Sequence, residues 1–242
     1  MSGFHAFAQG GLVNDIAQNI RRIQERAAMA AISCGRAPDE ITLLAISKTF
    51  PPESILQAAE AGLHRVGENR VQEAEGKILR LRQTLNLEWH LVGHLQSNKA
   101  KRAVELFDRI HSLDSTHLAS RLSQAGVEMG KIQSVLLQVD LGQEETKFGA
   151  DPEHIREILE AVSGLKGIQV DGLMTLPPFF DDPEKTRPFY AKLREMRDTL
   201  NSEQPGCLGR KHLSMGMSHD FEEAIREGAT IIRVGTAIFG SR

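Results

Sequence analysis

Apolar positions recur along the chain with two different periods, and the change of period marks the predicted elements. Residues 12–32 place apolar side chains three and four positions apart, which predicts a long amphipathic helix before any strand. Short apolar runs of strand length then alternate with segments of helical period. The pattern predicts strands at 41–47, 64–66, 88–92, 108–111, 132–139, 168–173, 211–213 and 230–234, with helices at 52–61, 71–85, 98–107, 115–129, 152–163, 185–204 and 220–227.

Strands that alternate with helices predict a parallel sheet, and eight such units predict an α/β fold closed into a (β/α)8 TIM barrel. The rival architecture is an open doubly wound sheet, which needs a glycine-rich fingerprint after an early strand. The sequence has no such fingerprint. A helix after the last strand is missing from the pattern, and we expect the extra N-terminal helix to cover that gap. Residues 1–242 are expected to form a single domain.

Composition narrows the class of protein. The 242 residues are 40% hydrophobic and 25% charged, with a formal net charge of −3. These values are typical of globular proteins and indicate neither a nucleic-acid-binding nor a membrane-surface protein. Cys34 and Cys207 lie far apart, which favours a reducing cytoplasm over a disulfide framework. No apolar run approaches the roughly 18 residues of a membrane helix, the N-terminus is not typical of a secretory signal, and no histidine spacing indicates a metal site.

The carboxyl ends of barrel strands hold the candidate chemistry. Lys48 follows an apolar strand, where loss of hydration favours the neutral, nucleophilic amine. A lysine that simply extends into solvent explains the position equally well. The loops after the last two strands, 214–218 and 235–236, offer small residues, hydroxyls and backbone N–H groups that suit a phosphate. Glycine and serine are also ordinary turn residues.

Arg233 lies on the last predicted strand and shares a face with Gly235. An arginine that points into a barrel needs a partner there. A structural ion pair with an acid such as Glu68 is as consistent with the spacing as a role in ligand binding.

Other residues near the expected mouth have two interpretations each. His94 and His219 could act as bases, although a turn histidine bonded to the backbone is the simpler interpretation. Lys147 lies in a polar loop and could bond an aldehyde instead of Lys48. The basic cluster at 99–102 is interpreted as a solvated helix face.

Several longer motifs occur together and in a fixed order. They are Ser47-Lys48-Thr49 and the segments 67–73, 89–99, 172–175, 213–220 and 233–240. With these motifs the chain resembles the YggS/PROSC family, the pyridoxal 5′-phosphate (PLP) homeostasis proteins, from about residue 12 onward.

The resemblance implies a barrel like the N-terminal domain of alanine racemase, which is fold type III of the PLP enzymes. It implies that Lys48 forms a Schiff base with the cofactor aldehyde and that Arg233 faces the pyridine nitrogen. The residues that it implies for the phosphate are Ser214, Gly235 and Thr236, and those for the pocket walls are Asn69, His90 and Met215.

The resemblance leads us to expect a cytoplasmic PLP-binding protein for PLP homeostasis, without substantial catalytic turnover. Arginine can only donate hydrogen bonds, so a ring nitrogen that faces Arg233 stays unprotonated and the cofactor is a weak electron sink. Racemisation needs two proton-transfer groups on opposite faces of the α-carbon. In the racemases the second group is a tyrosine from a second domain, whereas the single tyrosine here, Tyr190, lies within a predicted helix.

The expected partners are PLP and the apo-enzymes that could receive it, with no nucleic acid and no membrane. A PLP-dependent amino-acid racemase or other α-carbon enzyme is the first alternative. A Schiff-base aldolase that acts on a phosphorylated sugar without a cofactor is the second, since it would share Lys48 and the phosphate loops.

Overall fold

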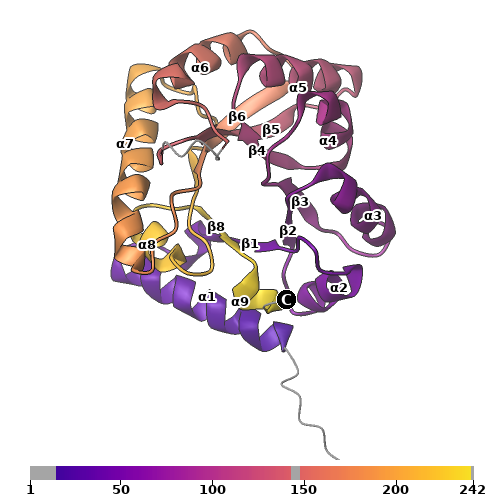
Figure 1. Ribbon diagram of the computed structural model, residues 1–242, viewed down its shortest axis with the longest axis vertical. Coiled ribbons are helices and arrows are strands. Elements are labelled where there is room, and N and C mark those ends of the chain that lie inside the picture. Colours follow the sequence, from indigo (N-terminus) through magenta and orange to yellow (C-terminus); the bar gives the residue numbers. More distant parts are fainter. Residues whose placement is uncertain (1–14, 143–147, 241–242) are drawn as a thin grey trace, which may run out of the picture.

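The structure is a computed structural model that describes residues 15–142 and 148–240. Within these residues eight parallel strands follow one another around a closed barrel, and β1 pairs with β8 (Figure 1). The predicted TIM barrel is therefore confirmed. The strands are β1 (Thr42–Ile46), β2 (Arg65–Glu68), β3 (Glu88–Leu91), β4 (Arg109–Leu113), β5 (Gln133–Val139), β6 (Ile168–Thr175), β7 (His212–Ser214) and β8 (Ile231–Val234).

Helices surround the barrel, and short 3-10 turns precede several of them (Figure 1). The helices are α1 (Ile16–Ser33), α2 (Pro52–Glu60), α3 (Val71–Leu81), α4 (Ala100–Leu106), α5 (Thr116–Glu128), α6 (Ile155–Ser163), α7 (Arg187–Glu203), α8 (Phe221–Arg226) and α9 (Thr236–Phe239), and the turns are η1 (Pro38–Glu40), η2 (Ser97–Lys99), η3 (Pro152–His154) and η4 (Pro183–Thr186).

Side chains alternate between two cores because successive strand residues point to opposite faces of the sheet. On β1, Leu44 and Ile46 belong to the small apolar cluster inside the barrel, together with Met174 of β6. Ala45 belongs to the larger core between the strands and the helices. This alternation decides which face each residue at a strand end occupies.

The N-terminal helix α1 closes the outer ring. It packs against α2, α8 and α9 and lies alongside them in Figure 1. The Asn19 amide donates to the carbonyl oxygen of Ile238 at 2.9 Å, and Arg26 pairs with Glu222 at 2.7 Å. The helix thus lies in the gap where it was expected. The prediction that no helix follows β8 was wrong, since α9 follows it at once; a helix of four residues is too short to show a period.

Several strands extend beyond their predicted ends. β2 continues to Glu68, β6 to Thr175 and β7 to Ser214. The apolar run stops earlier in each case, although the backbone ladder continues through polar residues. Side chains that were assigned to loops therefore belong to the barrel wall, which changes their surroundings.

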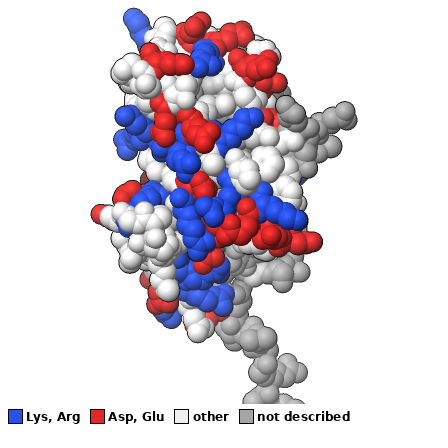
Figure 2. Space-filling model, turned by 90° about the vertical axis from the view of Figure 1, so that its left-hand side faces the viewer, with Lys and Arg blue, Asp and Glu red and all other residues white. Residues whose placement is uncertain are grey.

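The outer face over α7 carries both signs of charge, as Figure 2 shows. Arg187 and Arg194 both pair with Glu227, at 2.8 and 2.5 Å, and Arg156 pairs with Glu203 at 2.7 Å. Several of the charges on α7 are thus joined in ion pairs. Of the described helices, none has the length and apolar character needed to span a membrane.

Candidate functional site

The turn that carries Lys48 is fixed from the outside of the barrel. Ser47 is buried, and its hydroxyl donates to Oε1 of Glu68 at 2.5 Å. Because Ser47 points outward, strand alternation puts Lys48 on the inner side, in line with Leu44 and Ile46. Lys48 itself is exposed. An amine at this place is therefore open to a ligand at the carboxyl end of β1.

Thr49 adopts a positive φ of 66°, which is rare for a β-branched residue and marks a constrained backbone. Its N–H donates to Oε1 of Glu73 on α3. The backbone is thus held on both sides of Lys48, at Ser47 and at Thr49.

Lys77 of α3 joins these contacts into one buried group. Its ammonium donates to Ser47 O at 2.9 Å, to Glu68 Oε1 at 2.7 Å and to Glu73 Oε1 at 2.8 Å. Burial raises the pKa of Glu68, which is fully buried, and its second carboxylate oxygen has no partner within the described structure. Of the two interpretations of Arg233, an ion pair with Glu68 is wrong, because Glu68 points outward to Lys77.

Arg233 lies inside the barrel and is 4% exposed. It donates to Ser214 Oγ and to the carbonyl oxygen of Thr175, both at 2.8 Å. Among the described residues no carboxylate forms an ion pair with it. Burial lowers the pKa of Arg233 to about 10, so the guanidinium is a cation at neutral pH.

The loops after β7 and β8 meet at the start of α9. The hydroxyl of Ser218 accepts from the N–H groups of Gly235 and Ala237, at 3.3 and 3.4 Å. Gly235 lies beside β1, where a Cβ would come within 3.2 Å of Ile46 O. Thr236 is exposed. The two predicted phosphate loops therefore form one cradle, with Ser218 as its hydroxyl.

The structure places three of the predicted site residues away from the open mouth. Ser214 is fully buried, and its hydroxyl is engaged by Arg233 and lies 2.9 Å from His111 Nδ1. Met215 points outward into the core between strands and helices. His90 is fully buried within the barrel, 2.9 Å from Glu88 and 2.9 Å from His111. Strand alternation accounts for Met215, which follows the inward-pointing Ser214 by one residue, whereas Ser214 and His90 are held inside the barrel by their hydrogen bonds.

Asn69 follows β2 and is half-buried. Gly93, which follows β3, lies so close that a Cβ there would come within 2.2 Å of the Asn69 carbonyl oxygen. Only glycine allows this approach of two backbones. Asn69 is thus held at the carboxyl ends of β2 and β3, where a pocket wall was expected.

Two histidines at the mouth each contact a phenylalanine ring; for His219 this is Phe179, with ring centroids 5.4 Å apart. The rings of His94 and Phe148 are stacked with centroids 3.8 Å apart, and His94 Nδ1 lies 3.4 Å from Asp114. His219 lies 3.0 Å from the carbonyl oxygen of Asp181, in agreement with the simpler interpretation of a turn histidine. Lys147 lies outside the described residues.

The remaining candidates are paired or distant. Within the cluster at 99–102, Lys101 pairs with Glu128 at 2.9 Å and Arg102 with Glu75 at 2.5 Å. Cys34 and Cys207 are free thiols. In the part of the chain that the structure describes, no three His, Cys, Asp or Glu side chains are grouped to hold a metal ion.

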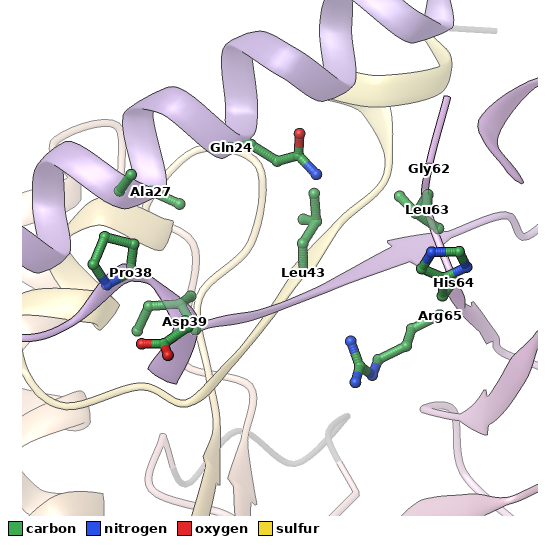
Figure 3. A pocket seen from close by; sticks show the side chains of 11 residues that line it. Gln24, Ala27, Pro38, Asp39, Leu43, Gly62, Leu63, His64 and Arg65 are labelled. Atoms are coloured by element: carbon green, nitrogen blue, oxygen red, sulfur yellow. The ribbon is translucent and has the colours of Figure 1, made fainter. Parts of the chain in front are cut away.

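Two hollows lie at the opposite end of the barrel from Lys48. One of about 400 Å³ is lined by side chains from α1, η1 and the starts of β1 and β2, including Asp39 and His64 (Figure 3). The other, of about 470 Å³, is lined by His64, Arg65 and Glu88 among others. Both lie at the amino ends of the strands, where barrels do not carry their active sites.

His111 and Lys77 are the important residues that the sequence interpretation missed. His111 follows Arg109 by two positions on β4, so both point into the barrel. Two polar residues that lie two positions apart in a buried strand, and so on the same face of the sheet, are the signal that could have revealed hydrogen bonds inside the barrel.

Comparison with known proteins agrees with this geometry. Residues 13–242 match the family described as alanine racemase, N-terminal domain. A pyridoxal phosphate homeostasis protein of Aquifex aeolicus is 46% identical over 225 residues, which cover 93% of this chain and 97% of the relative. The structure of PipY from Synechococcus elongatus PCC7942 with PLP bound is 40% identical, has a TM-score of 0.82, and is matched over 93% of this chain and all of that one.

The alanine racemase of Clostridium difficile 630 shares the fold. Its TM-score is 0.69 at 17% identity, over 95% of this chain and 57% of the racemase. The matched residues, the relatives at full length and the barrel together confirm the resemblance seen in the sequence. This chain belongs to the family of pyridoxal phosphate homeostasis proteins, built on the N-terminal domain of alanine racemase.

Proposed function

We propose that this chain binds PLP reversibly through Lys48 and serves intracellular PLP homeostasis without substantial catalytic turnover. One observation carries the proposal: Lys48, which follows β1, and Arg233 of the adjacent strand β8 lie on the inner side of the barrel, next to the cradle at Ser218 and Gly235. PLP supplies an aldehyde that a lysine amine can bond covalently. A PLP-bound structure of the relative PipY supports the choice of ligand.

The residues present suit the parts of this cofactor. Arg233 is a buried donor without a carboxylate partner among the described residues, which suits an unprotonated aromatic nitrogen. Gly235 lets this loop lie close against β1, because a Cβ there would come within 3.2 Å of Ile46 O. The backbone of Gly235 and Thr236 and the hydroxyl of Ser218 suit a phosphate. In this proposal Ser218 takes the place first given to Ser214.

Two features argue against turnover. Tyr190, the single tyrosine of the sequence, is fully buried and donates to Asp220 Oδ2 at 2.8 Å. Burial raises the pKa of its hydroxyl, and the carboxylate of Asp220 raises it further, so Tyr190 is unsuited to exchange a proton. Arg233 cannot supply a proton to a ring nitrogen under neutral conditions.

The test is an absorption spectrum of the purified chain with added PLP, before and after borohydride, followed by peptide mass mapping. We expect a visible band that borohydride fixes onto Lys48. Lys48→Ala should lose the band and the adduct. Lys101→Ala is the matched control, because it removes an exposed lysine from the outer face and should keep both.

Absence of a band and of an adduct would overturn the proposal and favour the aldolase interpretation. Rapid exchange of amino-acid α-protons by the loaded protein would instead support an α-carbon enzyme. We further propose that the bound PLP is passed to apo-enzymes and that this takes place in the cytoplasm. The two distant cysteines favour such a reducing compartment. Activation of a PLP-free aminotransferase by the loaded protein, faster than by the loaded protein after borohydride fixation, tests this step.

A further inference from the structure

A chain of hydrogen bonds runs through the inside of the barrel from the start of β3 to β8. Oε1 of Glu88 lies 2.9 Å from Nε2 of His90, and Nδ1 of His90 lies 2.9 Å from Nε2 of His111. Nδ1 of His111 lies 2.9 Å from Ser214 Oγ, which accepts from Arg233 at 2.8 Å. His90, His111 and Ser214 are fully buried. The five side chains come from four different strands, so only the closed barrel assembles them.

The Glu88 end fixes the direction of every hydrogen bond in this chain of side chains. An ionised carboxylate can only accept, and each neutral imidazole has one donor and one acceptor nitrogen. The hydrogen bond from His90 and the nearby guanidinium groups hold the pKa of Glu88 down at about 2, so this carboxylate is ionised. Ser214 must then donate to His111, His111 to His90, and His90 to Glu88. Both imidazoles carry their proton on Nε2.

Both histidines are neutral in this arrangement. Burial lowers the pKa of His90 and of His111, and the charge of Arg233 lowers that of His111 further. A proton added to His90 would place two donors face to face across the 2.9 Å contact with His111, and a proton added to His111 would place its charge close to that of Arg233. Arg233 cannot release a proton, so the chain cannot carry net protons from one end to the other. Its effect is to orient the groups at its ends.

The Glu88 end is open to solvent, whereas the Arg233 end is closed. The Glu88 side chain is 33% exposed and borders the hollow of about 470 Å³ at the amino ends of the strands. Its other oxygen, Oε2, accepts from Arg65 at 2.9 Å. At the far end, Thr175 O holds the second nitrogen of Arg233.

We propose that Glu88, His90, His111 and Ser214 are positioning residues, which hold the Arg233 guanidinium in the orientation that the cofactor meets. The proposal rests on the function proposed above, because it concerns Arg233 as part of the PLP site. It means that a change at the amino end of the barrel alters PLP binding at the other end. It also commits the Ser214 hydroxyl to His111 rather than to a phosphate.

The first test needs no cofactor. Long-range 15N–1H spectra of the apo-protein at pH 7 report the protonation of each imidazole nitrogen. We expect His90 and His111 to be neutral, with the proton on Nε2 in both. A proton on Nδ1 of either ring, or a charged ring, would overturn the oriented chain.

The second test replaces the acceptor at the Glu88 end of the hydrogen-bond chain by a donor. In Glu88→Lys the acceptor becomes a donor, so we expect both imidazoles to move their proton to Nδ1. Ser214 then accepts from His111 as well as from Arg233, which weakens its hydrogen bond to the guanidinium, and we expect PLP affinity to fall about tenfold. Glu88→Gln keeps an acceptor oxygen and should retain the wild-type spectra and affinity. Arg65→Ala is the matched control, since Arg65 contacts Oε2 of Glu88 and leaves the His90 contact at Oε1 intact.

Ser214→Ala removes the hydroxyl that accepts from Arg233, at the other end of the hydrogen-bond chain. This variant provides the test if Glu88→Lys does not fold. It should also weaken PLP binding about tenfold and shift the 15N signal of the labelled pyridine nitrogen. Affinity within twofold of wild type in both variants would overturn the positioning role. If the wild-type protein forms no adduct on Lys48, the proposed function fails, while the apo-protein spectra still decide the orientation of the chain.

Discussion

The ammonium group of Lys77 lies 2.9 Å from the carbonyl oxygen of Ser47, the residue that precedes Lys48. The same nitrogen pairs with Glu68 and Glu73, and the Lys77 side chain is only 8% exposed. A helix outside the barrel therefore holds the turn from which Lys48 reaches inward.

Replacing Lys77 by methionine should destabilise the fold. Removal of one partner of a buried ion pair costs about 3 kcal/mol, because the remaining charge is left uncompensated. Urea denaturation measures the change. Arg80→Met on the same helix is the control, since Arg80 pairs with Glu53 on the surface and should change stability by less than about 1 kcal/mol. Equal losses in the two variants would contradict the importance of the buried group.

The approach of Gly93 to Asn69 predicts a second effect. A Cβ at Gly93 would come within 2.2 Å of Asn69 O, so Gly93→Ala must displace the backbone there. We expect a loss of about 1–3 kcal/mol in stability and weaker PLP binding. Gly76→Ala is the matched control: Gly76 lies within α3 with open space around it, and alanine there should gain up to about 1 kcal/mol. Thermal unfolding of both variants measures the change in stability, and titration with PLP measures the change in affinity.

Tyr190→Phe removes the hydroxyl that donates to Asp220. Asp220 Oδ1 also accepts from the N–H of Met217 at 2.7 Å and so supports the loop that holds Ser218. We expect a stability loss of about 1–3 kcal/mol, since a buried carboxylate oxygen is left without its partner. The Lys48 adduct should still form. Loss of the adduct with an intact fold would show that Tyr190 takes part in the chemistry.

The buried histidines make stability depend on pH. Burial lowers the pKa of His90 and His111 in the folded chain below the ordinary 6.5, so the unfolded chain binds more protons at lower pH. Their contribution is present above pH 6.5 and is lost as the pH falls below it, by about 1 kcal/mol per pH unit for each histidine. The groups that face them are Glu88, Asp108, Arg109, His212 and Arg233.

Unfolding free energies between pH 7.5 and 5 test this dependence. The paired carboxylate of Glu88 titrates far lower, near 2, and does not contribute in this range. His64→Ala, which removes an exposed histidine, should leave the slope unchanged. A flat stability curve across this range would show that neither buried ring resists protonation.

The order of strands and helices could be predicted from the sequence because hydrophobic period is a local property. The register of single residues at strand ends could not. Ser214 was assigned to a phosphate loop, but β7 extends through it, and its hydroxyl lies inside the barrel against Arg233 and His111. The position of Lys48 at the carboxyl end of β1 could be predicted because the apolar run before it is well defined.

Contacts between strands distant in sequence remained beyond prediction. His111 and Ser214 are 103 residues apart and meet only across the closed barrel. No spacing along the chain encodes that contact. The same holds for Lys77 and Ser47, which belong to a helix and a strand of different units.

The pairing of β1 with β8 also bears on how the chain folds during synthesis. Thr42 lies opposite Ile231 in the ladder, and Asn19 of α1 bonds to Ile238, 219 residues later. At about 5–20 residues per second, a ribosome makes these partners roughly 10–40 s apart. Until β8 emerges, β1 presents an unpaired strand edge that can bind other nascent chains. The unpaired edge of β1, which later pairs with β8, is therefore the part of the nascent barrel that a chaperone would need to shield from other chains.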